Sequence, residues 1–294
     1  RGLATLPSLA RERAAKAVPR LADPARVVEM HTASERGPHH LYFAWGKGAP
    51  GRLAVLGVSE RGYSLALRTA GDLVASLHGA LGLSGGLAGA DLRTSLDTAA
   101  ALALAGFLDV LRANRLLSEL QHRLPLESAS AEEVAARLSE ARLDDPRWPL
   151  HTLQQVLPLD LAASAQQAEV PAALGRLVAA GLLESVEPSG ALPALFSPAP
   201  ALGPLVEESA RAVAHLALSV FQQGPSGAPV FESALLLRGP LSLWLLSVAP
   251  PAASLASLSA AGASQLLVRL APTEPPPLSA PGPAPTVLLP GLTS

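Results

Sequence analysis

The chain has 294 residues, a formal net charge of −2, 16% charged residues and no cysteine. The near-neutral charge gives no general attraction to nucleic acid or to an anionic membrane. The lack of cysteine excludes disulfides, zinc–thiolate sites, iron–sulfur clusters and cysteine nucleophiles, and it fits a cytoplasmic location. Because hydrophobic residues make up 49% but aromatic residues only 3%, the core must be built from Leu, Ala and Val.

Residues 1–90 have the pattern of a small antiparallel sheet with one helix. The first twenty residues are basic and lack the apolar segment of a signal peptide, so we expect a solvated amphipathic helix there. Short apolar runs separated by turn residues then predict a meander of strands. The expected strands are 27–32, 40–45, 53–58 and 63–67, and Thr69 is expected to cap a helix over 70–81.

Residues 91–147 form a helical region. Asp91 is the expected N-cap of a long helix that runs to about His122, since apolar residues from Leu92 to Leu117 recur at near-helical spacing. The sequence Ser-Ala-Glu-Glu at 130–133 has the form of a capping box, which predicts a second helix through about residue 143.

Residues 148–200 carry a recognisable local pattern. Short helices are expected over 150–157 and 162–168. The phrase that follows, Val-Pro-Ala-Ala-Leu-Gly-Arg-Leu-Val-Ala-Ala-Gly-Leu-Leu-Glu at 170–184, resembles the third helix of winged-helix domains. That resemblance implies a helix that ends at a glycine and a wing hairpin from Leu182 to Phe196.

Residues 201–271 return to strands. We expect strands over 213–221, 230–237 and 241–248, a helix over 252–261 and a last strand over 265–270, followed by a Pro-rich tail at 272–294. The stretch 239–268 has no charged residue, but a Pro-Pro pair and several serines interrupt it, so no membrane span is predicted.

The two ends of the chain therefore look alike. Each is expected to form strands with an associated helix, and the segments 51–58 and 239–248 are candidates for corresponding strands. The predicted fold class is α+β. Two small antiparallel sheets with associated helices are expected to flank a helical centre that includes the winged-helix-like segment.

Three motifs contain residue types found in catalytic or binding sites, but none has the surrounding sequence or secondary structure that such a site requires. Gly-Leu-Ser-Gly-Gly at 82–86 matches the nucleophile elbow around Ser84 but follows a helix, where the elbow needs a strand. His31, His39 and His40 lie near Glu29, but the adjacent His39 and His40 point to opposite faces of a strand, which favours a strand surface over a metal site. The Gly-rich segment 46–51 lacks the order of a phosphate-binding loop. No catalytic residue, cofactor or metal ligand is predicted, and we do not expect an enzyme.

The plan of sheet, helices and sheet in a cysteine-free chain of this length resembles the chaperones of the type VII (ESX) secretion pathway. The strands 41–45, 53–58 and 241–248 carry this resemblance. It implies two related halves and a cytosolic protein that binds helical secretion substrates.

The leading functional hypothesis is a protein-binding adaptor or chaperone, possibly in secretion, whose partner is another protein or a second copy. The alternative is a winged-helix transcription regulator with a sheet-based sensor or dimerisation domain. Nucleic acid is not expected, because Arg176 is the only arginine or lysine among the acidic residues of the region between Trp148 and Pro200. Tyr42 and Trp45, which point to opposite faces of one strand, and Arg176 are the candidate partner-binding residues.

Overall fold

The computed structural model describes residues 8–34, 37–46, 51–59, 62–83, 87, 92–140, 148–155, 157, 169–186, 193–223 and 229–270. The first part of the chain contains α1 (Ser8–Ala22), β1 (Pro24–Ser34), β2 (Gly37–Gly46), β3 (Arg52–Ser59), β4 (Gly62–Thr69) and α2 (Ala70–Ala80). The middle contains β5 (Arg93–Asp97), α3 (Thr98–Leu120), β6 (Ala129–Ser130), α4 (Ala131–Glu140), α5 (Pro149–Gln155), α7 (Val170–Ala179), β7 (Leu183–Val186), β8 (Leu195–Pro198) and α8 (Gly203–Ala210). The last part contains β9 (Ala214–Gln223), β10 (Pro229–Arg238), β11 (Leu243–Ala249), β12 (Ala252–Ser257) and α9 (Ala260–Leu270).

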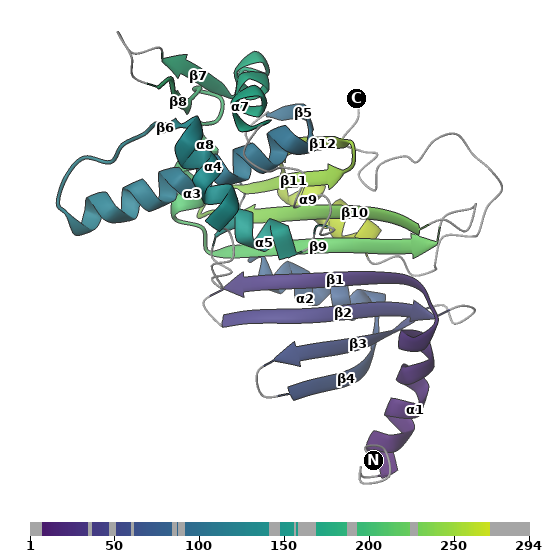
Figure 1. Ribbon diagram of the computed structural model, residues 1–294. Helices are drawn as coiled ribbons and strands as arrows, with labels where there is room; N and C mark the ends of the chain where they lie inside the picture. Colours follow the sequence, from purple (N-terminus) through teal and green to yellow (C-terminus); the bar gives the residue numbers. More distant parts are fainter. Residues whose placement is uncertain are drawn as a thin grey trace.

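One nine-stranded sheet forms the centre of the molecule, in the order β4-β3-β2-β1-β9-β10-β11-β12-β5 (Figure 1). All neighbouring strands in it are antiparallel. The sheet contains two four-stranded meanders, β1–β4 and β9–β12, each followed by one helix, and β5 is added beside β12. The first strands of the two meanders, β1 and β9, pair along the middle. The strands expected to correspond, β3 and β11, are each the third strand of their meander.

The α+β class predicted from the sequence is confirmed, but the prediction of two small sheets is wrong. The hairpins within each meander are local in the chain, so turn residues and apolar runs reveal them. The pairing of β1 with β9 joins residues about 190 positions apart, for example Glu29 with Ser219. No local pattern in the sequence indicates such a contact, and it is this pairing that turns two sheets into one.

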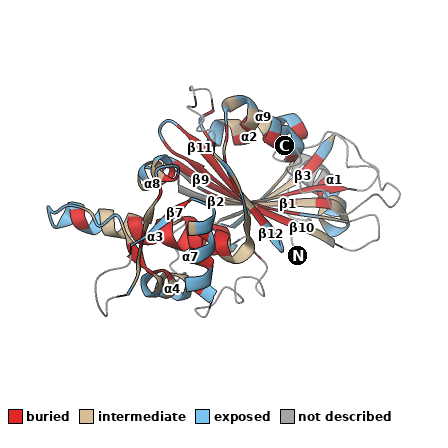
Figure 2. Cartoon of the chain, turned by 90° about the horizontal axis from the view of Figure 1, so that it is seen from above, coloured by how far each residue is buried: buried red, intermediate tan, exposed pale blue. Residues whose placement is uncertain are grey.

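Helices cover both faces of the sheet (Figure 2). On one face α2 and α9 pack on side chains that include Phe43, Trp45 and Leu218. On the opposite face α3, α4, α5, α7 and α8 form the helical centre over β9–β12, and α1 packs on Ala44 and Ala54 near the β4 edge. The strands alternate between these faces, as the period of two residues requires.

The long helix α3 holds the helical centre together. Every residue from Ala100 to Leu111 is buried, so this half of the helix is surrounded on all sides. Asp97 caps it, since the backbone N–H of Ala100 donates to Asp97 Oδ1 at 2.8 Å. The predicted cap, Asp91, lies outside the described residues, and the chain from Arg93 to Asp97 is strand β5, so the helix begins later than expected.

Two predicted caps are confirmed. Thr69 and Asp72 form a reciprocal capping box at the start of α2. Ser130 and Glu133 do the same at the start of α4, with the Ser130 N–H donating to Glu133 Oε2 at 2.7 Å. Such caps satisfy backbone donors that the helix leaves unpaired, and each contributes about 1 kcal/mol.

The end of the described chain differs from the prediction. The expected strand over 241–248 and the turn at Pro250-Pro251 are present, but the next two elements are exchanged. Residues 252–257 form strand β12 and residues 260–270 form helix α9, where a helix and then a strand were predicted. Within the described residues, no helix has both the length and the apolar composition needed to cross a bilayer.

Candidate functional site

Five exposed leucines gather at the C-terminal end of α3, where this helix extends past the helices that cover its first half (Figure 1). We call this group the leucine tip. Its members and their exposed fractions are Leu116 (43%), Leu117 (47%), Leu120 (78%), Leu124 (89%) and Leu126 (59%). Single exposed leucines are ordinary on protein surfaces, but five of them within one short segment make it a candidate interaction site.

The chain reverses direction after α3, within the leucine tip. Helix α3 ends at Leu120, and His122 adopts a positive φ of 51° that reverses the chain. The N–H of Arg123 donates to the carbonyl of Ser118 at 3.0 Å, which closes the helix end. Residues 121–128 then return toward the body, where Leu126 helps to line a small hollow with Leu111 and Val206.

Leu117 is the last residue of the apolar pattern that predicts the long helix. The apolar pattern continues through α3, but α3 is fully enclosed only as far as Leu111. Leu117 lies beyond that point and is 47% exposed. A continuous apolar stripe indicates a helix face but not how far other helices cover it, so the leucine tip was missed.

Tyr42 and Trp45 point to opposite faces of β2, as the sequence predicted. Trp45 is 1% exposed and lies in the core beneath α2 and α9, with the Arg26 guanidinium 5.9 Å from its ring centre. Trp244 on β11 is also 1% exposed. Tyr42 is half-buried on the other face, so only Tyr42 of the candidate pair on β2 is accessible to a partner.

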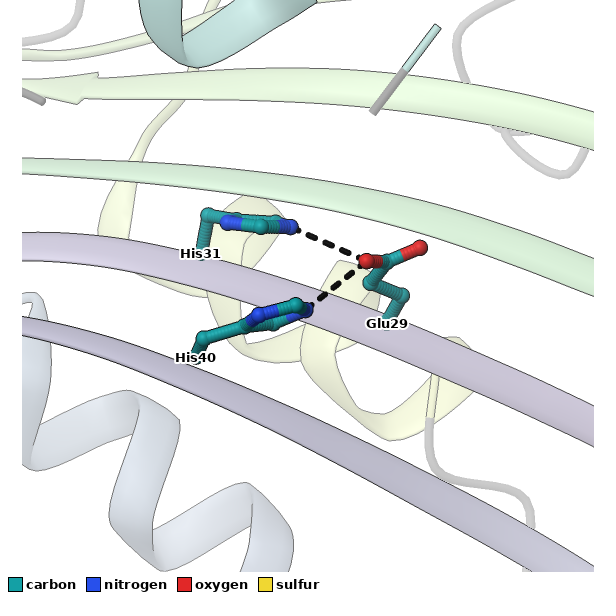
Figure 3. A group of neighbouring side chains, drawn as sticks. All are labelled: Glu29, His31 and His40. Carbon is teal, nitrogen blue, oxygen red and sulfur yellow. Dashed lines mark hydrogen bonds and ion pairs between the residues drawn. The ribbon is translucent and has the colours of Figure 1, made fainter. Parts of the chain in front are cut away.

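Tyr42 adjoins a polar cluster made by Glu29, His31 and His40 on strands β1 and β2 (Figure 3). His31 pairs with His40 in the register of the two strands, and Glu29 pairs with Tyr42, so all four side chains share one face. Nε2 of His31 lies 3.0 Å from Oε1 of Glu29, and Nε2 of His40 lies 2.8 Å from the same oxygen. The two imidazole rings stack with their centres 3.8 Å apart.

The surroundings set the charge of this cluster. Burial alone would raise the pKa of Glu29, but hydrogen bonds from His31 and His40 and the positive charge of His31 bring the pKa below its ordinary value. Burial and the charge of His31 lower the pKa of His40, against the opposing effect of Glu29. Burial and the negative charge of Glu29 raise the pKa of Tyr42 to about 12. Glu29 is therefore a carboxylate at neutral pH.

The adjacency of His39 and His40 favoured a plain strand surface in the sequence, but the cluster joins His40 to His31 and Glu29 of the neighbouring strand. The signal that identifies this group is the hairpin register, which follows from the turn between β1 and β2. Two imidazole nitrogens and a carboxylate oxygen are a set that can accept hydrogen bonds, bind protons or coordinate a metal ion.

The winged-helix-like phrase forms the local structure that the sequence predicted. Helix α7 ends at Ala179, the chain turns at Gly181 with a φ of 71°, and strands β7 and β8 pair in antiparallel orientation. The tip of the predicted wing and the expected helix over 162–168 lie outside the described residues, as does Ser84. A winged-helix domain therefore stays a prediction.

Arg176 points from α7 toward the start of α3. Its Nε lies 2.6 Å from Oδ2 of Asp97, the residue that caps α3, and both side chains are almost half exposed. In this arrangement Arg176 ties the winged-helix-like segment to the helical centre. The exposure still leaves it accessible to a partner.

We expect Arg176→Ala to lower the free energy of unfolding by less than about 1 kcal/mol, since an exposed ion pair contributes little. Asp97→Ala should cost more, about 1–2 kcal/mol, because it also removes the helix cap. Urea denaturation of the two variants measures both effects. A larger loss for Arg176→Ala than for Asp97→Ala would contradict this assignment.

Comparisons with known proteins give matches among solved structures only. No family model matches the chain, and no curated protein matches it. The solved structure of the Mycobacterium tuberculosis type VII secretion system chaperone EspG5 in complex with the PE25–PPE41 dimer matches with a TM-score of 0.42 and 8% identity, over 88% of this chain and 76% of that chain.

Proposed function

We propose that this protein is a non-catalytic, cytoplasmic protein-binding adaptor or chaperone, and that the leucine tip is its docking surface. The observation that carries the proposal is the group of five exposed leucines between residues 116 and 126. Water-exposed leucine side chains gain roughly 1.5–3 kcal/mol each when fully buried, which is a sufficient driving force for association. The resemblance to secretion chaperones agrees with this function, and the proposal does not depend on it.

The shape of the leucine tip favours an apolar helix of another protein as the occupant. Leu116, Leu117 and Leu120 lie on the last two turns of α3 at the spacing of one helix face, which forms a short ridge for helix–helix packing. A permanent dimer needs about 20–30 residues on each side, and the tip spans 116–126 only. A short amphipathic helix, bound reversibly, fits a surface of this size.

The charge of the winged-helix-like segment supports a protein partner over DNA. Arg176 is the only basic residue of α7, and the structure pairs it with Asp97. A helix that reads the major groove needs several basic side chains free for phosphates. Helix α7 has no basic side chain besides Arg176.

The test is the paired variant Leu120→Glu, Leu124→Glu, which places two charges on the most exposed leucines of the tip. A photo-crosslinking residue at position 116 in the native host identifies the protein that contacts the tip. The affinity of the purified chain for that protein is then measured by calorimetry. We expect the paired variant to weaken binding at least tenfold, since buried apolar anchors dominate such interfaces.

Val268→Glu is the matched control, because Val268 is a 58% exposed apolar residue on helix α9, away from the tip. It should leave the affinity unchanged. Light scattering shows whether the partner is a second copy of the chain. If the wild type is a dimer and the variant Leu120→Glu, Leu124→Glu is a monomer, the chain binds itself through the leucine tip. Unchanged affinity of the paired variant, or sequence-specific nanomolar binding of duplex DNA, would contradict the proposed function.

A further inference from the structure

The cluster of Glu29, His31 and His40 has the composition and convergence of a metal-binding site. Each residue offers one ligand atom, and these atoms all lie within 4.8 Å of one another. Two imidazoles and one carboxylate are the protein ligands of many three-ligand zinc sites. No metal ligand is predicted from the sequence, because adjacent His39 and His40 point to opposite faces of a strand.

We propose that Glu29, His31 and His40 bind a divalent transition-metal ion of the zinc class. Zinc lies about 2.0–2.2 Å from nitrogen and carboxylate ligands, so tetrahedral ligand atoms are separated by roughly 3.3–3.5 Å. The nitrogen–oxygen distances here are 2.8 and 3.0 Å. A small outward movement of the Glu29 carboxylate is enough to admit the ion, and water completes its coordination.

The strand geometry presents the two imidazoles ready for this role. Both Nε2 atoms point at one carboxylate oxygen from the same side, and the rings stack at 3.8 Å (Figure 3). Because His31 and His40 are paired across two hydrogen-bonded strands, the backbone fixes their separation. Little conformational freedom is lost when such a preorganised set binds an ion.

Groups around Glu29 hold it in place. Tyr42 hydrogen-bonds to Glu29, and the hydroxyl of Ser219 donates to Glu29 Oε2 at 3.4 Å. Such partners orient a ligating carboxylate and influence metal affinity by tenfold or more in many sites. The cluster is also reachable, since the side chains of His31, Glu29 and His40 are 15%, 18% and 28% exposed.

The test uses the full chain, freed of metal by a chelator and titrated with Zn²⁺ in a calorimeter. We expect one ion per chain, and His31→Gln, His40→Gln and Glu29→Gln should each weaken binding at least tenfold. His122→Asn is the matched control, since it removes an exposed histidine outside the cluster and Asn tolerates the positive φ of 51° at that position. Tyr42→Phe should weaken binding less than the ligand variants do.

A second measurement covers the case in which a variant folds poorly. Zn²⁺ should raise the Tm of the wild-type chain and of His122→Asn, because a ligand that binds only the folded state stabilises it. Co²⁺ should give visible absorption bands of a nitrogen- and oxygen-coordinated ion that the double variant His31→Gln, His40→Gln lacks. Equal Zn²⁺ affinity in this double variant and in the wild type, or no ion bound to the wild type, would overturn the proposal.

This inference is separate from the proposed docking function. The leucine-tip variant Leu120→Glu, Leu124→Glu should keep its full Zn²⁺ affinity, because the tip belongs to α3 and the segment after it and the cluster to β1 and β2. The two proposals can therefore fail independently.

Discussion

Trp45→Ala is expected to lower the free energy of unfolding by about 3–5 kcal/mol, the usual cost of removing a large buried aromatic side chain. Trp45 is 1% exposed and packs in the core beneath α2 and α9. The change also removes the ring beside Arg26, whose guanidinium lies 5.9 Å from the ring centre and donates to the carbonyl of Leu270 at 3.3 Å. Lost packing and a lost cation–π contact act in the same direction.

Urea denaturation followed by circular dichroism measures this loss. Tyr42→Ala is the control on the same strand, and it should cost less because Tyr42 is only half-buried on the opposite face. The pair also separates core packing from partner contact. A Trp45→Ala variant of normal stability that no longer binds its partner would contradict the core assignment of Trp45.

Local features of this fold could be predicted from the sequence because short-range chemistry determines them. Thr69 and Ser130 cap helices through their own side chains, and the chain turns after α7 at Gly181, which has a positive φ. The alternation of apolar residues on β2 correctly places Tyr42 and Trp45 on opposite faces. In each case the interacting residues are within a few positions of one another.

The exchanged elements near the C-terminus have a different cause. Strand β12 consists of Ala, Ser and Leu, which have little intrinsic strand preference, and it is a strand because β11 and β5 flank it. For α9 the sequence did contain a signal. Ala263, Leu266, Leu267 and Leu270 are its buried residues, and their spacing of three, one and three positions is that of a helix face.

The candidate sites depend on contacts that the sequence does not specify locally. Leu111 and Leu120 are both apolar residues of one helix, yet the first is 5% and the second 78% exposed. The difference depends on where the covering helices end. The metal-binding cluster likewise depends on the register that pairs His31 with His40, and a shift of one residue would send their side chains to opposite faces.

Ala217→Pro is expected to destabilise both halves of the sheet together, by about 3 kcal/mol or more. Ala217 is fully buried in β9, between His31 of β1 and Leu235 of β10. Because β9 has a neighbour on each side, proline there removes a ladder hydrogen bond and places its ring against a packed strand. A loss of this size is a large part of the 5–15 kcal/mol that typically stabilises a domain.

Hydrogen exchange distinguishes one sheet from two. If the β1–β9 pairing makes the sheet a single unit, Ala217→Pro should reduce amide protection in β3 and in β11 to a similar extent, although these strands lie in different meanders. Ala217→Ser keeps the backbone N–H and should leave most of the protection in both strands. Had the two meanders been independent sheets, proline in β9 would expose β11 and leave β3 protected, and that result would contradict the joined sheet. The pairing of β1 with β9 is the only strand pairing between the two meanders in the described sheet order.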